Sequence, residues 1–235
     1  MSDFRNELRV LCDSEWAKLK KGKFFSAINE AVNSSDHKKL LELYVRTMVE
    51  VYHYTKCNAI NQAVASITVD HKDLKLLRFV LRHALEETGH ENMAKRDALS
   101  LCDNEDFFNQ EPLPATEAFN GYLYSVALKY GGIARLGYSF WAEDSYHQVG
   151  DLLEILQNDL KLTEKQLTFF ISHAVIDEKH SKEVNDMIDQ YIKTEEDKKL
   201  TMKVAQTTIY MLGKILDNVA EEVESSSFEI NLKSL

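Results

Sequence analysis

The chain has 235 residues, of which 44% are hydrophobic and 28% are charged, and its formal net charge at pH 7 is −10. This composition allows a sizeable core, and the chain lacks the run of about 18 apolar residues that a membrane-spanning helix needs. The acidic balance and the lack of a basic stripe argue against a nucleic-acid binder.

The helical patterns suggest one large helical domain. Helix-forming residues are abundant, and the two prolines both lie in the predicted loop 103–114. In chain order, the predicted helices cover residues 3–32, 37–67, 71–101, 115–130, 132–159, 163–192 and 196–222. Asp36 is a predicted N-cap, and Thr163 with Gln166 forms a predicted capping box. We expect an all-α protein with a single domain over residues 1–224 and a loose tail over 225–235.

The three cysteines, Cys12, Cys57 and Cys102, are widely spaced and form no Cys-x-x-Cys motif. A disulfide framework or a structural zinc site is therefore not expected. The N-terminal residues carry charge early and lack an apolar signal core. We expect a cytoplasmic protein in a reducing compartment, with no membrane partner and no nucleic-acid partner.

The strongest motif has the pattern His-x-x-x-Asp-x-x-His. His173, Asp177 and His180 stand at i, i+4 and i+7, so on a helix they fall within about 60° of arc. The same arc carries apolar side chains such as Phe169 and Val184. Two imidazoles and a carboxylate that face a core carry a desolvation cost unless they are paired. A metal ion would pair all three at once.

A second motif lies in the predicted helix 71–101. Glu87 and His90 form a Glu-x-x-His pair whose members reach the same side of a helix. His83, one turn before Glu87, is an additional candidate ligand on that face. Glu86 lies at the margin of the face and is the alternative to Glu87. The pattern is weak by itself, because charged helices contain it by chance.

A third candidate is Glu143, which shares an apolar face with Phe140 in the predicted helix 132–159. A carboxylate at such a position needs a cation. His147 follows at i+4 as a further ligand or as a neighbour of the site. Asp144 lies on the adjoining face and competes with Glu143 for the role.

The three helices together offer imidazole and carboxylate groups without thiolates, a mixture that suits iron or manganese better than structural zinc. Six or seven ligands are more than one ion with open positions requires. Two ions that share a bridging carboxylate fit the number of ligands. The candidate ligands are His83, Glu87, His90, Glu143, His173, Asp177 and His180.

The run Glu86-Glu87-Thr88-Gly89-His90, the later Glu143 and the run from His173 to His180 resemble the haem-oxygenase-like di-iron oxidases and oxygenases, including the TenA/PqqC-like helical fold. The likeness covers most of the chain. It implies a haem-oxygenase-like bundle of about seven helices around two iron ions. By motif match, Glu143 would bridge the ions, and His83 departs from the simplest pattern.

The resemblance also implies a function. Members of the family use two Fe(II)/Fe(III) ions and O2 as co-substrate, and oxidise small molecules through a peroxo-diferric intermediate. We expect an oxidoreductase whose substrate is an amino acid or an amino-acid derivative, with N-oxygenation, desaturation or oxidative C–C cleavage as the reaction. An external electron donor and a homodimer are compatible with this expectation. A fatty-acid oxidative decarboxylase of the same fold is the first alternative.

Further alternatives remain open. They are a metal-free TenA/PqqC-like enzyme and a non-catalytic binding protein whose polar cluster is a buried hydrogen-bond network. Haem degradation is disfavoured because the first 36 residues contain no histidine. Lys129 and Arg135 are possible anchors for a carboxylate. The expected substrate pocket comprises Tyr44, Tyr52, Asn58, Phe140, Tyr146 and His147.

Overall fold

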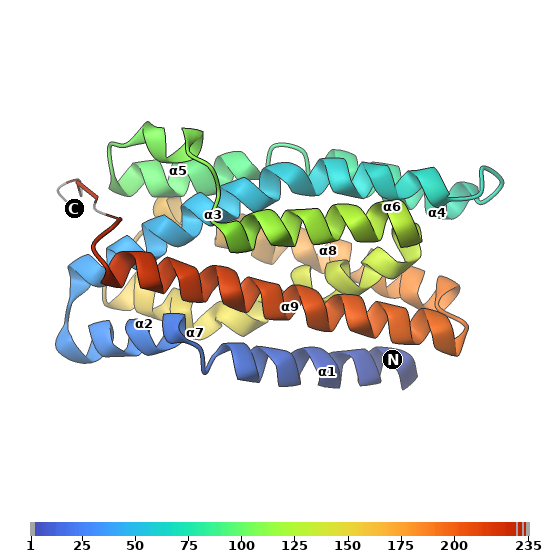
Figure 1. The fold of residues 1–235 in the computed structure, drawn as a ribbon, viewed down its shortest axis with the longest axis horizontal. Coiled ribbons are helices and arrows are strands. Elements are labelled where there is room, and N and C mark those ends of the chain that lie inside the picture. The colour runs from blue at the N-terminus through green and yellow to red at the C-terminus, as the bar shows by residue number, and fades with distance from the viewer. Residues whose placement is uncertain (1–2, 229, 232, 234–235) are drawn as a thin grey trace.

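A computed structural model describes residues 3–228, 230, 231 and 233, and the side chains of residues 146 and 174–178 lie outside this description. The described part is helical and contains no strand, so the prediction of an all-α protein is confirmed. The helices are α1 (Asp3–Leu19), α2 (Lys23–Ser34), α3 (His37–Val64), α4 (Leu74–Glu86), α5 (Glu91–Leu101), α6 (Pro114–Ala142), α7 (Ser145–Asn158), α8 (Thr168–Tyr191) and α9 (Glu195–Glu224). They form an elongated bundle (Figure 1). No helix of this part is both long and apolar enough to cross a membrane.

The described part has nine helices instead of the expected seven, because three predicted helices are interrupted while the predicted helix 115–130 and the start of the predicted helix 132–159 are joined in α6. The predicted helix 3–32 breaks between α1 and α2, and the predicted helix 132–159 breaks between α6 and α7. The predicted helix 71–101 breaks at residues 87–90, where Gly89 adopts a φ of 92°. That left-handed conformation ends a helix and is readily available only to glycine.

The start of α8 depends on a side chain from another helix. The capping box of Thr163 and Gln166 is present, but it caps a short 3-10 turn instead of the predicted helix. The α-helix begins at Thr168, where the Asp97 carboxylate of α5 accepts hydrogen bonds from the backbone N–H of Thr168 at 3.0 Å and of Phe169 at 2.8 Å. Asp97 is fully buried, so α5 fixes the position of α8.

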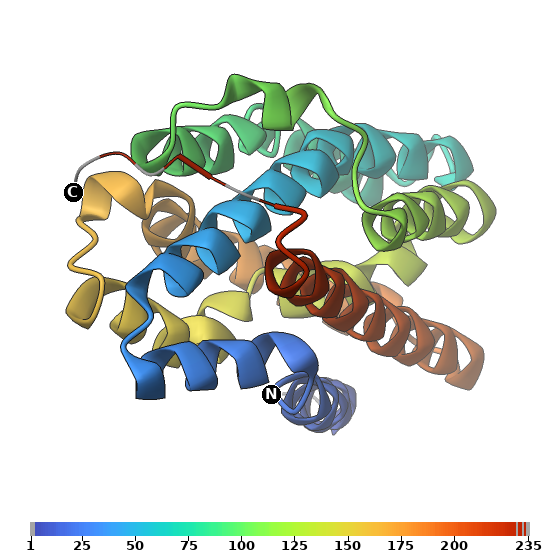
Figure 2. The same ribbon diagram turned by 60° about the vertical axis from the view of Figure 1, so that its left-hand side comes forward.

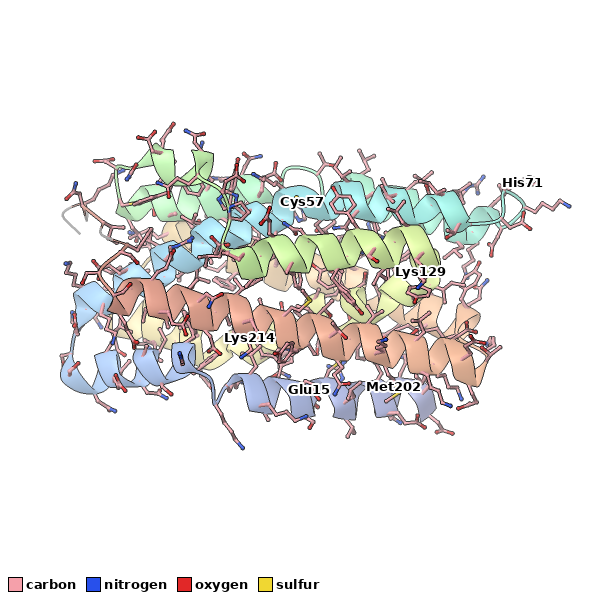
Figure 3. The ribbon with its side chains drawn as sticks, in the orientation of Figure 1. Glu15, Cys57, His71, Lys129, Met202 and Lys214 are labelled. Atoms are coloured by element: carbon pink, nitrogen blue, oxygen red, sulfur yellow. The ribbon has the colours of Figure 1, made fainter. Side chains whose placement is uncertain are left out.

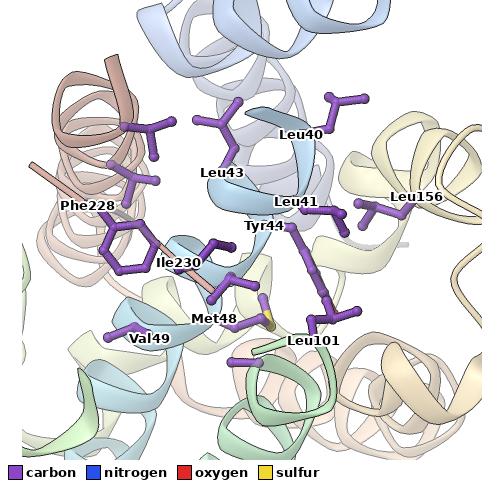
Figure 4. Packing of buried hydrophobic residues seen from close by; sticks show 14 of the residues in the cluster. Leu40, Leu41, Leu43, Tyr44, Met48, Val49, Leu101, Leu156, Phe228 and Ile230 are labelled. Atoms are coloured by element: carbon purple, nitrogen blue, oxygen red, sulfur yellow. The ribbon is translucent and has the colours of Figure 1, made fainter. Parts of the chain in front are cut away.

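Helix α3 runs through the middle of the bundle (Figure 2), where it contacts α2, α4, α5, α6 and α9. One apolar cluster surrounds its first half and includes Leu43 and Met48 (Figure 4). The segment after Glu224 differs from the expected loose tail in its described part. Phe228 and Ile230 are buried in this same cluster, because both have large apolar side chains that pack beside α3 and are removed from water there.

Helix α6 carries a kink that aims its second half at the interior. Gly131, inside α6, has a non-helical φ of 72° and ψ of −161°. A Cβ atom at this position would lie 1.8 Å from Thr68 Oγ1. The predicted break between residues 130 and 132 is therefore a kink within one long element.

We expect Gly131→Ala to destabilise the protein by about 1–3 kcal/mol, because alanine is strained at positive φ and would clash with Thr68. Gly121→Ala is the matched control, since it lies in the same helix with open space around its Cβ position. It should be neutral or stabilising by up to about 1 kcal/mol. Urea unfolding measures both, and equal effects would contradict the assigned role of the kink.

Candidate metal centre

Four predicted ligands converge between α4, α6 and α8. His83, Glu87, Glu143 and His180 each offer one ligand atom, and these atoms lie within 4.8 Å of one another. His83 Nε2 lies 3.0 Å from Glu143 Oε1 and 3.7 Å from Glu87 Oε1. His180 Nδ1 lies 3.3 Å from Glu143 Oε2 and 3.7 Å from Glu87 Oε1. Each carboxylate therefore lies near both imidazoles, whose rings also pack against each other with centroids 4.9 Å apart.

Both carboxylates sit at the points where helices end. Glu87 is the C-cap of α4 and Glu143 is the C-cap of α6. Asp144, the competing acid, pairs with Arg9 of α1. The break in the predicted helix 132–159 thus separates the two acids, with Glu143 in the cluster and Asp144 directed toward α1.

A second group of predicted ligands adjoins the first. His90 Nδ1 lies 3.5 Å from Glu87 Oε2, and the ring of His90 packs edge-on against His173 with centroids 4.9 Å apart. His173 Nδ1 lies 2.6 Å from the Phe169 carbonyl oxygen, to which it can donate. That hydrogen bond would leave Nε2 as the nitrogen with a free lone pair. Glu87 is common to both groups.

Glu86 lies on the outer side of His180, where it contacts Nε2 at 3.1 Å. Lys179 holds Glu86 from outside at 2.9 Å. Metal-ligating histidines commonly donate their second N–H to a carboxylate, which fixes the ring orientation. The structure therefore gives Glu86 the geometry of an orienting group, while Glu87 faces the cluster.

A polar chain supports Glu87 from the side of α3. Asn58 Nδ2 donates to Glu87 Oε2 at 2.9 Å, and Asn58 Oδ1 accepts a hydrogen bond from Arg135 of α6. Arg135 also donates to Asn61 Oδ1 at 2.8 Å and to Ser139 Oγ at 3.2 Å. These contacts hold one oxygen of Glu87 in a fixed position.

The electrostatics of the cluster are those of a buried ion-pair network. Burial raises the pKa of Glu143, but the contacts with His180 and His83 outweigh it and lower the pKa to about 2. Burial lowers the pKa of His180, but Glu143 and the other nearby carboxylates raise it to about 9. For His173, burial dominates and lowers the pKa, so its ring is neutral at pH 7. The metal-free cluster therefore holds protons that a divalent cation would displace.

These residues fit a bound metal ion. Within the described part, His90 Nδ1 and His180 Nδ1 are buried and make no hydrogen bond of normal geometry, although both lie beside carboxylate oxygens. An ion between the imidazoles and carboxylates would satisfy these nitrogens. The donor set of nitrogen and oxygen atoms is one that iron and manganese accept. One group of four such residues is found among the described residues.

A cavity of about 140 Å³ adjoins the cluster and lies between the two apolar clusters of the bundle. His83, Glu87, Glu143 and His173 form part of its wall. Most of the remaining wall is apolar. A cluster of titratable groups that opens into an apolar cavity is the usual form of a small-molecule site.

Among the expected substrate-pocket residues whose side chains are described, Asn58 lines the cavity and the others lie elsewhere. Tyr44 belongs to the apolar core (Figure 4), and its hydroxyl donates to the Gln166 carbonyl at 2.9 Å. Tyr52 packs against Phe108 instead. The sequence shows that these residues share one face of a helix. It cannot show that this face packs against different neighbouring helices at different positions.

The two candidates near Glu143 are also displaced from the cavity. The Phe140 ring packs under the Arg9 guanidinium at 5.0 Å, and His147 is exposed on α7. The break after Ala142 separates His147 from the face of Glu143. The side chains of Asp177 and Tyr146 lie outside the described residues.

Several polar residues of the site were not predicted from the sequence. Thr55 and Ser139 line the cavity, and Asn61 helps to hold Arg135. A spacing of four residues between Arg135, Ser139 and Glu143 could have indicated a shared face of α6. Arg135 is 2% exposed, whereas Lys129, the other possible anchor, is exposed on the surface (Figure 3).

A helical bundle that encloses histidines and carboxylates is an architecture of helical metalloproteins. The profile of a family described as iron-containing redox enzymes matches residues 47–212. The chain belongs to this family of iron-containing redox enzymes.

Two solved structures place the fold. A domain of unknown function with a haem oxygenase-like fold from Shewanella denitrificans OS217 is 36% identical, with a TM-score of 0.85 over 94% of each chain. A TenA homolog from Pseudomonas syringae pv. tomato DC3000 is 9% identical, with a TM-score of 0.71 over 93% of each chain, and shows the fold alone. The expected haem-oxygenase-like fold is confirmed. No significant match was found among curated protein sequences.

The alternative between Glu86 and Glu87 can be tested by metal titration. We expect Glu87→Gln to lose at least one bound metal ion, because Glu87 faces both groups of histidines. Glu86→Gln should keep the stoichiometry and lower the affinity by about 10–100-fold, as loss of an orienting partner does. Anaerobic Co(II) titration followed by absorbance measures both variants, and the reverse pattern would make Glu86 the ligand.

A second prediction concerns pH in the metal-free protein. Because the folded pKa of His180 is raised to about 9 from an ordinary 6.5, its stabilising contribution is complete below pH 6.5. The contribution is lost as the pH rises through 9. The melting temperature of the metal-free protein should therefore fall between pH 6.5 and 9, and His180→Gln should flatten this decline.

The matched control for this prediction is His71→Gln, since His71 is an exposed histidine in the loop before α4 (Figure 3). It should leave the pH profile of the melting temperature unchanged. A wild-type profile that rises between pH 6.5 and 9 would contradict the assigned pairing of His180.

Proposed function

We propose that this protein is a non-haem di-iron oxidase or oxygenase that uses O2 to oxidise a small organic substrate. The observation that carries the proposal is the convergence of His83, Glu87, Glu143 and His180 beside an apolar cavity. Membership of a family of iron-containing redox enzymes supports iron as the metal. When bound, the iron would supply the binding and reduction of O2.

The residues present divide into two overlapping ligand sets. His83, His180 and Glu143 would hold one ion, and His90 with His173 would hold the other. Glu87 lies between the sets and contacts both. We extend the second set to Asp177 because of its spacing from His173 and His180 in the sequence.

The rest of the chain has three tasks in this proposal. Glu86 orients His180 through its Nε2, and Asn58 orients Glu87 through one carboxylate oxygen. Aromatic side chains such as Phe169 and Trp141 line the cavity and exclude water from it. Water exclusion strengthens the electrostatic interactions inside the site and protects reactive species.

The substrate is proposed to be an amino acid or an amino-acid derivative, with a fatty acid as the alternative. The cavity volume of about 140 Å³ suits a small molecule. The cavity wall combines polar groups near the cluster with apolar groups elsewhere. Both substrate classes have a polar head and an apolar body, so the wall is compatible with either.

The proposal predicts that the wild-type protein binds two Fe(II) ions per chain under anaerobic conditions and consumes O2 on mixing. Stopped-flow absorbance should show a transient visible band that depends on both equivalents of iron. His83→Ala should lose one ion and the band, because His83 Nε2 points at the centre of the cluster. His71→Ala, at the exposed histidine, should keep both.

Either of two results would contradict the proposal. One is a wild-type protein that takes up no iron, which would favour a metal-free enzyme of the same fold. The other is full iron binding without any O2 consumption in the presence of candidate amino acids and fatty acids. A His83→Ala variant that keeps two ions would remove His83 from the ligand set.

A further inference from the structure

Arg135 is a buried cation that lines the cavity without a carboxylate in direct contact. It lies on the part of α6 that follows the Gly131 kink and is 2% exposed. Its three observed hydrogen bonds go to the neutral oxygens of Asn58, Asn61 and Ser139. Among the described residues no ion pair to a carboxylate is found for it, although buried charges are ordinarily paired.

The guanidinium keeps its charge in this position. Burial lowers the pKa of Arg135 to about 10, which still leaves it protonated at neutral pH. Glu87 and Glu143 attract it from a distance, and Asn58 links it to Glu87. In the proposed function these two carboxylates are metal ligands. Once they bind the ions, much of their negative charge is cancelled and Arg135 has no anionic partner in the described part.

Arg135 also has N–H groups that donate none of these three hydrogen bonds. A guanidinium carries five N–H groups, and the hydrogen bonds to Asn61, Ser139 and Asn58 use one on each of its three nitrogens. Each terminal nitrogen therefore retains one N–H. Two N–H groups on separate terminal nitrogens are a donor set that a carboxylate can accept.

The wall of the cavity includes Arg135 and a few other polar groups among mostly apolar side chains. Thr55 also lines it, and the Thr55 hydroxyl is buried without a hydrogen-bond partner in the described part. The rest of the wall includes Phe24, Phe119, Val149, Leu152, Phe169 and Leu212. The volume of about 140 Å³ is close to that of cavities that accept a benzene-sized molecule.

We propose that Arg135 binds the carboxylate head of a small substrate whose body lies against the apolar wall of the cavity. This assignment rests on the proposed function, because it treats the cavity as the substrate site and the nearby carboxylates as metal ligands. Lys129, on the same helix, is exposed and has its ammonium 5.0 Å from the Tyr130 ring, so it takes no part.

The proposal implies that metal and carboxylate strengthen each other's binding. In the metal-free protein, Glu87 and Glu143 repel an incoming anion. Bound metal ions cancel that repulsion and leave the positive charge of Arg135 uncompensated. By linkage, the factor by which metal tightens carboxylate binding equals the factor by which carboxylate tightens metal binding.

Anaerobic calorimetry with hexanoate as the probe tests the assignment. The wild-type protein, metal-free and loaded with Fe(II), would be titrated with hexanoate, hexan-1-ol and hexylamine, which share a chain and differ in head group. We expect hexanoate to bind more tightly than hexan-1-ol in both forms, more tightly still with Fe(II), and hexylamine to bind least. Norleucine, which is hexanoate with an α-amino group, separates an amino-acid site from one for a simple acid.

Variants then locate the head group. Arg135→Gln should weaken hexanoate binding at least about tenfold in both forms, because it removes a charge-assisted hydrogen bond. Arg135→Lys should retain part of the affinity, since it keeps the charge and loses the fork of donors. Lys129→Gln removes the same charge from the surface of α6 and should bind hexanoate like the wild type.

The outcomes separate this proposal from the proposed function. If the wild type takes up no Fe(II), the di-iron function fails, while the metal-free titrations still decide the role of Arg135. Unchanged hexanoate affinity in a folded Arg135→Gln variant would overturn the assignment. If that variant does not fold, the wild-type comparison decides alone: hexan-1-ol binding as tightly as hexanoate would overturn it.

Discussion

Glu87 and Glu143 place two carboxylates in one buried space. The rest of the site supplies the contacts that offset the unfavourable free energy of burying two negative charges together. Burial raises the pKa of each acid, and the charge of Glu143 raises that of Glu87 further. Contacts with His90 and His83 reverse this effect for Glu87, and contacts with His180 and His83 reverse it for Glu143, so both acids stay ionised. Such a network is stable only while every member is present, because removing one cation leaves an uncompensated buried charge.

The breaks in the helices allow both carboxylates to lie beside the histidines that offset their charge. A continuous helix through residue 87 or residue 143 would present its side chains along a straight face. Instead, α4 and α6 end at these acids, and the chain turns immediately afterwards. His90 can then approach Glu87 from the turn, and Asp144 can pair with Arg9 away from the cluster. The kink at Gly131 serves the same end by directing the second half of α6 inward.

The fold class and the convergence of several candidate ligands could be predicted from the sequence, for a physical reason. Polar residues that recur at helical spacing within an apolar stripe must face the interior, as His173 and His180 do. The same reasoning placed His83 beside Glu87, and both lie in the cluster. It could not place the cavity, because a cavity depends on which helices pack together. Tyr44 and Tyr52 share a helical face with Asn58, yet Tyr44 is buried in the apolar core and Asn58 lines the cavity.

Helix breaks were the least predictable feature. The break at Gly131 was predicted, but the positive φ of Gly89 was not, and α8 begins where the Asp97 carboxylate of α5 caps it. Long-range capping of this kind leaves no local signal in the sequence. The support of Glu87 by Asn58 and Arg135 is hidden for the same reason, since these residues are far apart along the chain.

The packing of α9 has a consequence for how the protein reaches its native state. Helix α9 contacts α1, α2, α3 and α6, and Phe228 and Ile230 complete the apolar cluster beside α3 (Figure 4). Apolar faces of α1, α2 and α3 are thus covered by segments that are synthesised long after them. Before these segments are synthesised, the nascent chain exposes apolar surface and cannot form its final contacts. These contacts therefore form only after α9 has been synthesised, and the uncovered apolar surface favours aggregation until then.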